Sequence, residues 1–409
     1  MIDNPPCEAL HRRIPPLPKQ DDPDYWVKMR DQFPIPPDEA YCNTGTIGAS
    51  PLRVLHAVVN HMVQSMSEVA HVDWHGGGMS LLSGYSAYTE LRTKIGKLVN
   101  ADHTLIALTQ NATMGMNILS NGLELPRGSG VITTDIEHPG GRCGWELLAE
   151  RRGTTLNMAE IKFPVESPNQ IVEAFEDAIG PETRVMSFPH ISSEQGMILP
   201  AKELCDLARE HGIISIIDGA QATGHIPIDM EEIGCDAYYS SPHKWLMAPA
   251  GNGFLYVKEA LIDEVWTTLA SSQWNNHEDN GYRLGQRGTG NPALLKGLEA
   301  ALDLHFEIGP ERVYRRIKEL GGRLRRGLSR MDGTEIVTPV HPEMSSGLTT
   351  FKVEGIEGRT IQDELWRRGR IQPRALREGR GVRYSTHIYN SEDEIDRTLQ
   401  IIEELAQDR

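Results

Sequence analysis

Residues 213–257 read IISIIDGAQATGHIPIDMEEIGCDAYYSSPHKWLMAPAGNGFLYV. The opening run, Ile213–Ile217, is rich in β-branched residues and is bounded by Gly212 and Gly219, which predicts a short buried strand. Asp218 follows this strand directly. Because the carboxyl ends of strands face the ligand crevice in open α/β sheets, a carboxylate at this position is available for chemistry.

A second predicted strand, Ala237–Ser240, runs into Ser241-Pro242-His243-Lys244, and a glycine-containing turn precedes a third strand, Phe254–Val257. Lys244 or Asp218 alone would have a plain explanation, since a lysine after a strand is usually solvated and an aspartate often caps a helix. Both residues occur here in one segment, each at a strand end. The segment therefore predicts a site at one edge of the sheet, where an acid and a lysine lie close together.

This combination suits a pyridoxal phosphate enzyme, which needs a lysine to hold the aldehyde and an acid to keep the pyridine nitrogen protonated. The segment closely resembles the cofactor segment of the class V aminotransferase family of fold-type I pyridoxal phosphate enzymes. In that family, Asp-x-x-Gln and Ser-x-His-Lys stand at about this separation. The resemblance implies pyridoxal 5′-phosphate as the cofactor and no metal ion.

The resemblance also assigns roles to individual residues of the segment. It implies that Lys244 forms the Schiff base with the cofactor and that Asp218 pairs with the pyridine nitrogen. Gln221 is expected to contact the ring hydroxyl, and Ser241 and His243 are expected to approach the phosphate.

A phosphate loop is expected earlier in the chain. The predicted strand Thr104–Thr109 ends in small polar residues and is followed by a helical pattern over Met114–Leu123. Such a junction presents unpaired backbone N–H groups and the positive end of a helix, which together bind phosphate. It resembles the family's phosphate loop, with the Ala112 N–H and Thr113 as the contacts.

Three other segments match the family around the cofactor. In the relatives a ring in the Asp135–Arg142 segment stacks on the pyridine; His138 is the candidate, and Pro139 occupies an alternative register. A loop with Asn43 and Thr44 borders the substrate side, although a plain turn before a helix would look the same. Ser193, upstream of the Asp218 strand, is expected to reach the cofactor hydroxyl or the substrate.

The run Gly381–Asn390 reads GVRYSTHIYN and resembles the ending of the isopenicillin N epimerase-like branch of the family. A guanidinium can form a bidentate pair with a carboxylate, so Arg383 is expected to hold an amino acid's α-carboxylate. The family's "Gly-Thr" implies that Thr289 reaches the partner's phosphate in a homodimer. Many relatives have arginine where this chain has Gly290, and Arg287 is a candidate to replace that charge.

The composition and net charge of the whole chain limit the classes of protein to which it can belong. It has 409 residues, 39% hydrophobic and 24% charged, which is ordinary for a globular protein. A net charge of −16 argues against nucleic-acid binding. The five dispersed cysteines suit a reducing compartment, and neither a membrane span nor a signal peptide is evident, so a cytoplasmic protein is expected.

The alternation of strands and helices predicts an α/β fold with a large domain built on a mostly parallel sheet and a small α+β C-terminal domain. We expect an N-terminal arm over residues 1–40, the large cofactor-binding domain over 41–305, and the small domain over 306–409, to which the N-terminal segment contributes. A helix is expected over Ala260–Leu269.

The sequence therefore predicts a pyridoxal phosphate enzyme that acts at Cα of an amino acid. Epimerisation and transamination are the first expectations, and a C–S or other β-lyase of the same family is the alternative. A cysteine desulfurase of the kind that carries a nucleophilic cysteine near Arg383 is disfavoured, because no cysteine follows Cys235. A non-catalytic sensor that binds the cofactor is a remote alternative, since the short N-terminal arm leaves no room for a DNA-binding domain.

Overall fold

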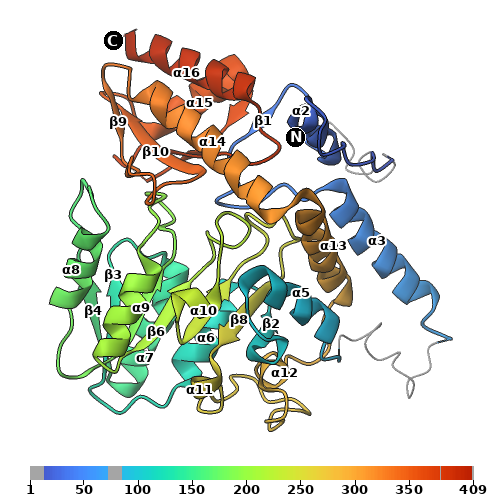
Figure 1. Cartoon of the computed structure of the whole chain (residues 1–409), viewed down its shortest axis with the longest axis vertical. Helices are drawn as coiled ribbons and strands as arrows, with labels where there is room; N and C mark the ends of the chain where they lie inside the picture. Colours follow the sequence, from blue (N-terminus) through green and yellow to red (C-terminus); the bar gives the residue numbers. More distant parts are fainter. Residues whose placement is uncertain (1–12, 72–84, 378, 408–409) are drawn as a thin grey trace.

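The structure is a computed structural model that describes residues 13–71, 85–377 and 379–407. The first twelve residues of the predicted arm lie outside these ranges. Two sheets dominate the molecule, a large one in the lower part of Figure 1 and a small one near the C-terminus in its upper part. Among the described residues, no helix is long and apolar enough to cross a membrane.

The large sheet has seven strands. Its order is β2 (Ile106–Thr109), β8 (Gly253–Val257), β7 (Ala237–Ser240), β6 (Ile214–Asp218), β5 (Thr183–Pro189), β3 (Gly130–Thr134) and β4 (Thr155–Ala159). Only β8 runs antiparallel to its neighbours, and the other pairings are parallel. The predicted mostly parallel α/β fold is therefore confirmed.

Both faces of this sheet are covered by helices, which explains why its strands are continuously apolar. Alternate residues of one strand serve opposite cores: Ile216 packs with α6 and α7, and Ile217 packs with α8 and α9. The covering helices are α5 (Thr89–Val99), α6 (Ala112–Gly122), α7 (Pro139–Arg152), α8 (Asn169–Asp177), α9 (Ala201–Glu210), α10 (Met230–Ile233), α11 (Glu259–Ile262) and α12 (Asn280–Leu284). The short 3-10 turn η2 (His103–Leu105) leads into β2.

The helix expected over Ala260–Leu269 is shorter than predicted, since α11 ends at Ile262. Beyond it Val265 is buried, and the Trp266 N–H donates to the Gly122 carbonyl at 3.0 Å. The chain is thus drawn against the end of α6, and this tertiary contact outweighs the local helical pattern.

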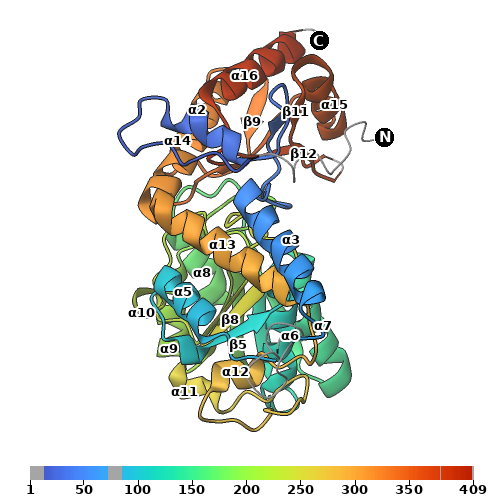
Figure 2. The same ribbon diagram turned by 90° about the vertical axis from the view of Figure 1, so that its right-hand side faces the viewer.

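Long helices join the large sheet to the small domain. Helix α13 (Pro292–Ile308) lies alongside α3 (Leu52–Ser67), as both views show, and α14 (Pro310–Leu328) continues into the small domain (Figure 2). There an antiparallel sheet has the order β12 (Arg374–Ala375), β13 (Val382–Ser385), β10 (Leu348–Val353) and β9 (Thr334–Ile336). Helices α15 (Gly358–Gly369) and α16 (Glu392–Gln407) pack with it.

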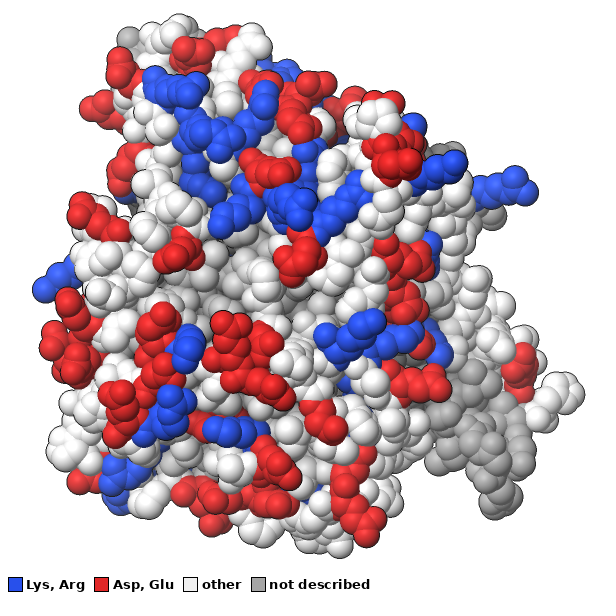
Figure 3. Space-filling model, viewed as in Figure 1, with Lys and Arg blue, Asp and Glu red and all other residues white. Residues whose placement is uncertain are grey.

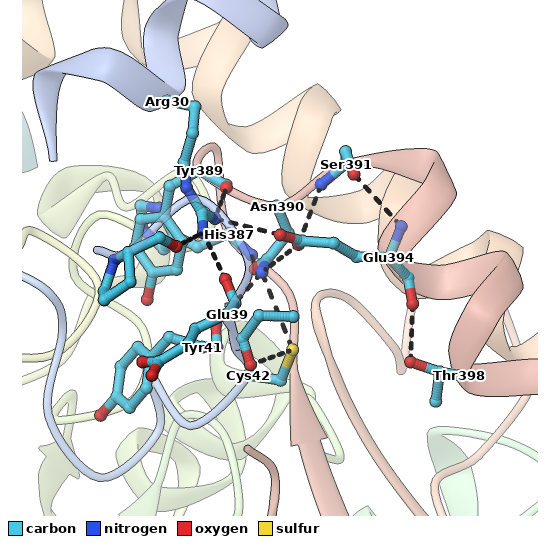
Figure 4. A network of polar contacts seen from close by, with 12 residues as sticks. Arg30, Glu39, Tyr41, Cys42, His387, Tyr389, Asn390, Ser391, Glu394 and Thr398 are labelled. Atoms are coloured by element: carbon cyan, nitrogen blue, oxygen red, sulfur yellow. Dashed lines mark hydrogen bonds and ion pairs between the residues drawn. The ribbon is translucent and has the colours of Figure 1, made fainter. Parts of the chain in front are cut away.

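The N-terminal segment contacts the C-terminal part of the chain. After α2 (Tyr25–Met29) and η1 (Arg30–Gln32), strand β1 (Ala40–Tyr41) pairs in parallel with β11 (Ile371–Gln372). Arg30 donates to the Tyr389 carbonyl at 2.6 Å and to Glu394 at 3.1 Å, and Asn390 donates to the Tyr41 carbonyl at 3.1 Å (Figure 4). This network fixes the loop that begins at Asn43 beside β13.

Candidate active site

A cavity of ≈ 730 Å³ lies where the carboxyl ends of β5, β6 and β7 meet the small domain. That volume is within the range of sites that hold a cofactor together with a small substrate. Its lining contains most of the residues expected from the sequence: Ala112, Thr113, His138, Ser193, Asp218, Gln221, Ser241, His243, Lys244 and Arg383. The structure thus brings together residues separated by more than 250 positions in the chain.

Lys244 is the cation at the centre of this cavity. Among the described residues, its ammonium group has no hydrogen bond or ion pair, although it lies close enough to Asp218 to feel that charge. Burial lowers the pKa of Lys244 to about 8. Gly48 allows this arrangement, because a Cβ there would lie 2.0 Å from the Lys244 carbonyl oxygen, and the Gly48 N–H donates to the His243 carbonyl at 2.8 Å.

Asp218 lies beside a second carboxyl group, that of Glu137, which the sequence analysis did not single out. Both side chains are buried, and a Cβ at Gly141 would lie 2.8 Å from Glu137 Cδ and 2.9 Å from Asp218 Oδ2. Burial and the charge of Asp218 raise the pKa of Glu137 well above its usual range. Burial raises the pKa of Asp218 as well, whereas the Ala220 N–H, which donates to it at 2.8 Å, and the nearby Lys244 favour its charged form.

His138 caps α7, and its ring orientation is fixed. Its Nδ1 accepts a hydrogen bond from the Gly140 N–H at 2.9 Å, and its backbone N–H donates to Glu137 at 2.6 Å. Burial and the positive charge of Lys244 lower the pKa of His138. The imidazole is thus neutral with its proton on Nε2, a form suited to packing against a ring. Pro139, the alternative position, is the first residue of α7.

The N-terminus of α6 forms the opposite end of the cavity. Asn111 caps the helix by accepting from the Met114 N–H at 2.9 Å, and the Ala112 N–H donates to Ser241 Oγ at 2.8 Å. His243 Nδ1 is buried and has no hydrogen-bond partner in the described part of the chain, and burial lowers the pKa of His243 to about 4. This cradle offers polar groups and a helix N-terminus to an anion.

Gln221 is held at both ends of its amide. Its Oε1 accepts from Trp245 Nε1 at 2.8 Å, and its Nε2 donates to the Gly45 carbonyl at 2.8 Å. Trp245 is fully buried and stacks on His225, with ring centroids 3.5 Å apart. One N–H of Gln221 is therefore left for a ligand in the cavity. The sequence analysis did not single out Trp245, although it directly follows Lys244.

Arg383 projects from β13 into the cavity. Its guanidinium donates to the Ser193 carbonyl at 2.7 Å, to Thr46 Oγ1 at 2.8 Å and to Asn43 Oδ1 at 3.3 Å. Its Nε is buried, and no described residue bonds to it. Burial and the nearby Arg374 lower the pKa of Arg383 to about 9.

Other expected residues lie differently. Thr44 is fully buried and shares a hydrogen bond with the Tyr389 hydroxyl, whereas the neighbouring Gly45 and Thr46 line the cavity. Thr289 is exposed and does not line the cavity of its own chain. Arg287 lies in a separate small cavity near Tyr88. Among the described residues, no group of His, Cys, Asp and Glu could hold a metal ion.

The residues fit pyridoxal phosphate at each position that the cofactor requires. The unpaired amine of Lys244 suits the aldehyde, Asp218 suits the ring nitrogen, and the α6 N-terminus with His243 suits the phosphate. The partnerless polar atoms at His243 Nδ1 and Arg383 Nε are groups that a bound anion would satisfy.

Comparison with known proteins agrees with this geometry. Residues 48–398 match the model of the family "Aminotransferase class-V". The isopenicillin N epimerase of Streptomyces clavuligerus is 30% identical over 93% of this chain and 98% of its own length. A probable cysteine desulfurase of Methanothermobacter thermautotrophicus is 27% identical over 92% of this chain and 97% of its own length.

Solved structures show the same fold. The cystine C–S lyase C-DES in complex with cysteine persulfide superposes with a TM-score of 0.80 at 25% identity, covering 91% of this chain and 99% of that one. Another C-DES structure carries glycine covalently linked to the pyridoxal phosphate cofactor. The chain therefore belongs to the class-V aminotransferase family of fold-type I, pyridoxal phosphate-dependent enzymes, as its sequence motifs predicted.

Proposed function

We propose that this enzyme removes the Cα proton of an amino acid, with epimerisation or transamination as the outcome. The observation that carries the proposal is Lys244, an amine without a partner and with a pKa of about 8, which lies in the cavity beside Asp218 and His138. A pKa near the working pH is what efficient proton transfer requires of a general acid or base.

Different residues of the cavity have different roles in this proposed reaction. Bound pyridoxal phosphate supplies an electron sink for the charge that develops at Cα. Asp218 keeps the ring nitrogen protonated, and the raised pKa of Glu137 disfavours a second negative charge beside it. Arg383 holds the α-carboxylate, and Lys244 accepts and returns the proton.

Among the other family reactions, C–S or β-elimination has support of its own. The cystine C–S lyase C-DES shares the fold over 91% of this chain. A reaction through a cysteine nucleophile is disfavoured, because none of the described cysteines, Cys42, Cys143, Cys205 and Cys235, lines the cavity. The alternative is therefore elimination without a protein persulfide.

A substrate panel separates these outcomes. The holoenzyme is incubated with amino acids in D₂O, with and without a keto acid, and Cα deuterium, chirality, ammonia, pyruvate and sulfide are followed. Deuterium with inversion and no keto-acid requirement supports epimerisation, and amino transfer supports transamination. Release of pyruvate and sulfide supports the lyase and overturns the first proposal, as does a panel in which no Cα deuterium appears.

We also propose a homodimer in which Thr289 reaches the partner's cofactor phosphate. Thr289 is exposed and lies outside the cavity of its own chain, so a role at a phosphate requires a second copy. Sedimentation should show a dimer, and Thr289→Ala should weaken cofactor binding. A monomer that binds the cofactor with full affinity would contradict this arrangement.

A further inference from the structure

We propose that the cavity selects an amino acid that carries a second anionic group, remote from its α-carboxylate, and that Arg374 and Arg377 bind this group. The inference rests on the proposed function, because it names the substrate class of the same site. It concerns the hairpin between β12 and β13, whose residues Arg374–Arg377, Arg380 and Arg383 line the cavity.

The first observation is a juxtaposition of like charges. Strands β12 and β13 are antiparallel, and Arg374 stands directly opposite Arg383. Both guanidiniums donate to the same hydroxyl, Thr46 Oγ1, at 3.0 and 2.8 Å. Like charges directly opposite in a sheet are destabilising, so this pair costs stability unless an anion lies between or beside the two groups.

The second observation is that the fold neutralises only some of the arginines around the cavity. Arg380 forms an ion pair with Glu194, and Arg142 forms one with Glu146 at 2.6 Å. Within the described parts of the chain, neither Arg374 nor Arg377 forms an ion pair. Arg377 is held by the hairpin turn, in which its carbonyl accepts from the Arg380 N–H at 3.0 Å.

The third observation is the charge balance of the filled site. The phosphate cradle at the α6 N-terminus, with Ser241 and His243, is formed by other elements than the hairpin. An α-carboxylate needs one guanidinium, for which the buried Arg383 is suited. Asp218 is proposed to serve the ring nitrogen, and burial and the charge of Asp218 raise the pKa of Glu137 well above its usual range. Two positive charges, on Arg374 and Arg377, therefore remain for the rest of the substrate.

The surface shows where the chain places its basic residues. Although the net charge is −16, Lys and Arg side chains gather over the small domain on the face seen in Figure 3. Such an arrangement raises the local concentration of anions. A substrate side chain that ends in a carboxylate, sulfonate or phosphate would meet Arg377 and Arg374 before its α-carboxylate reaches Arg383.

Matched substrates test the inference on the holoenzyme. Cα deuterium exchange is compared for glutamate against glutamine and for aspartate against asparagine, each pair differing in side-chain charge at nearly constant shape. We expect kcat/KM to favour the acid by at least about 10-fold, and the preference to shrink at high salt. The acid-to-amide ratio should fall towards one in Arg374→Gln and Arg377→Gln. Arg359→Gln, an exposed small-domain arginine paired with Asp363, is the control and should keep the ratio.

A binding measurement separates this inference from the proposed chemistry. Glutarate and adipate, which cannot react, are titrated against butyrate and hexanoate by the change in cofactor absorbance. Tighter binding of the dicarboxylates that depends on Arg374 and Arg377 supports the inference even if no amino acid exchanges its Cα proton, which would overturn the proposed function alone. Equal binding of the two series, or a preference that both variants retain, overturns the inference.

Discussion

Arg92 and Arg383 are both almost completely buried, yet their surroundings differ. Arg92 forms a bidentate pair with Asp279 and also donates to the Ala87 and His103 carbonyls at 2.7 and 3.0 Å. Among the described residues, Arg383 donates only to neutral oxygens, and its Nε has no partner there. The fold thus pairs the Arg92 guanidinium with a carboxylate, and it leaves the Arg383 guanidinium in the cavity available to an anionic ligand.

Neutral surroundings alone do not mark a site. Arg283 is buried and donates to the Val265 and Ile262 carbonyls, and Arg325 donates to the Ser346 carbonyl and Thr349. Neither lines the cavity. The distinguishing features of Arg383 are therefore its place in the cavity and the second arginine opposite it.

The largest effect is expected at Lys244, whose ammonium group has no hydrogen bond or ion pair among the described residues. Lys244→Ala removes both the point of cofactor attachment and the group that moves the proton, so activity should fall by about 10³-fold or more. Borohydride treatment followed by peptide mass spectrometry should find reduced cofactor on Lys244 in the wild type and none in the variant. Reduced cofactor on another lysine of the wild type would refute the assignment.

Arg383→Ala should weaken transition-state binding by roughly 2–5 kcal/mol, because it removes a charge-assisted pair from a desolvated pocket. At about 1.4 kcal/mol per decade, kcat/KM should fall on the order of 30-fold to several thousand-fold. Cofactor affinity should change little, since the phosphate and ring contacts are proposed elsewhere. Near-normal kcat/KM would require another group to hold the carboxylate, with Arg374, which stands opposite Arg383 in the same cavity, the first to test.

Arg92→Ala is the matched control, because it removes an equally buried guanidinium. It leaves Asp279 without its partner, so the free energy of unfolding should fall by about 3–5 kcal/mol while kcat/KM per folded molecule is retained. Denaturant unfolding measures the first quantity and titration of active sites normalises the second. If the two variants behaved alike in both measurements, the contrast between them would fail.

The pH dependence of cofactor attachment tests whether the pKa of Lys244 is lowered. Only the neutral amine attacks an aldehyde, and burial lowers the pKa of Lys244 to about 8. In cofactor-free enzyme, the rate of attachment should therefore rise on the order of 100-fold from pH 6 to pH 9 and then level off. Stopped-flow absorbance gives the profile. A rate that still climbs nearly tenfold between pH 8 and pH 9 would place the pKa of Lys244 at its ordinary value.

The sequence predicted the strand ends better than the loops, for a physical reason. Asp218 and Lys244 follow apolar strands, whose burial fixes where they end, so both could be placed. Arg374 lies in a two-residue strand between Pro373 and a turn, where no periodicity exists to be read. Its place opposite Arg383 depends on a long-range pairing that only the folded chain reveals.

The same limit applies to the loop before α3. The sequence analysis chose Thr44 for the substrate side, but this side chain turns towards Tyr389, and Thr46 lies in the cavity. The two threonines are alike in type and two residues apart. Their orientations are set by the pairing of β1 with β11 and by the network around Asn390, which connect segments more than 300 residues apart.

Thr46→Val has the smallest expected effect and is the most specific test of the contrast between Arg92, which is paired with a carboxylate, and the arginines of the cavity, which are not. Thr46 Oγ1 accepts from both Arg374 and Arg383, so its loss leaves two like charges opposite each other without their shared acceptor. A net loss of about 1–2 kcal/mol in total predicts a KM increase of roughly 5- to 30-fold for the substrate, with a smaller change in kcat. Thr93→Val, at an exposed threonine of α5 that bonds only to the Thr89 carbonyl, is the control and should leave KM unchanged. If Thr46→Val left KM unchanged as well, the two guanidiniums would not depend on Thr46 for their orientation, and the anion itself would have to align them on binding.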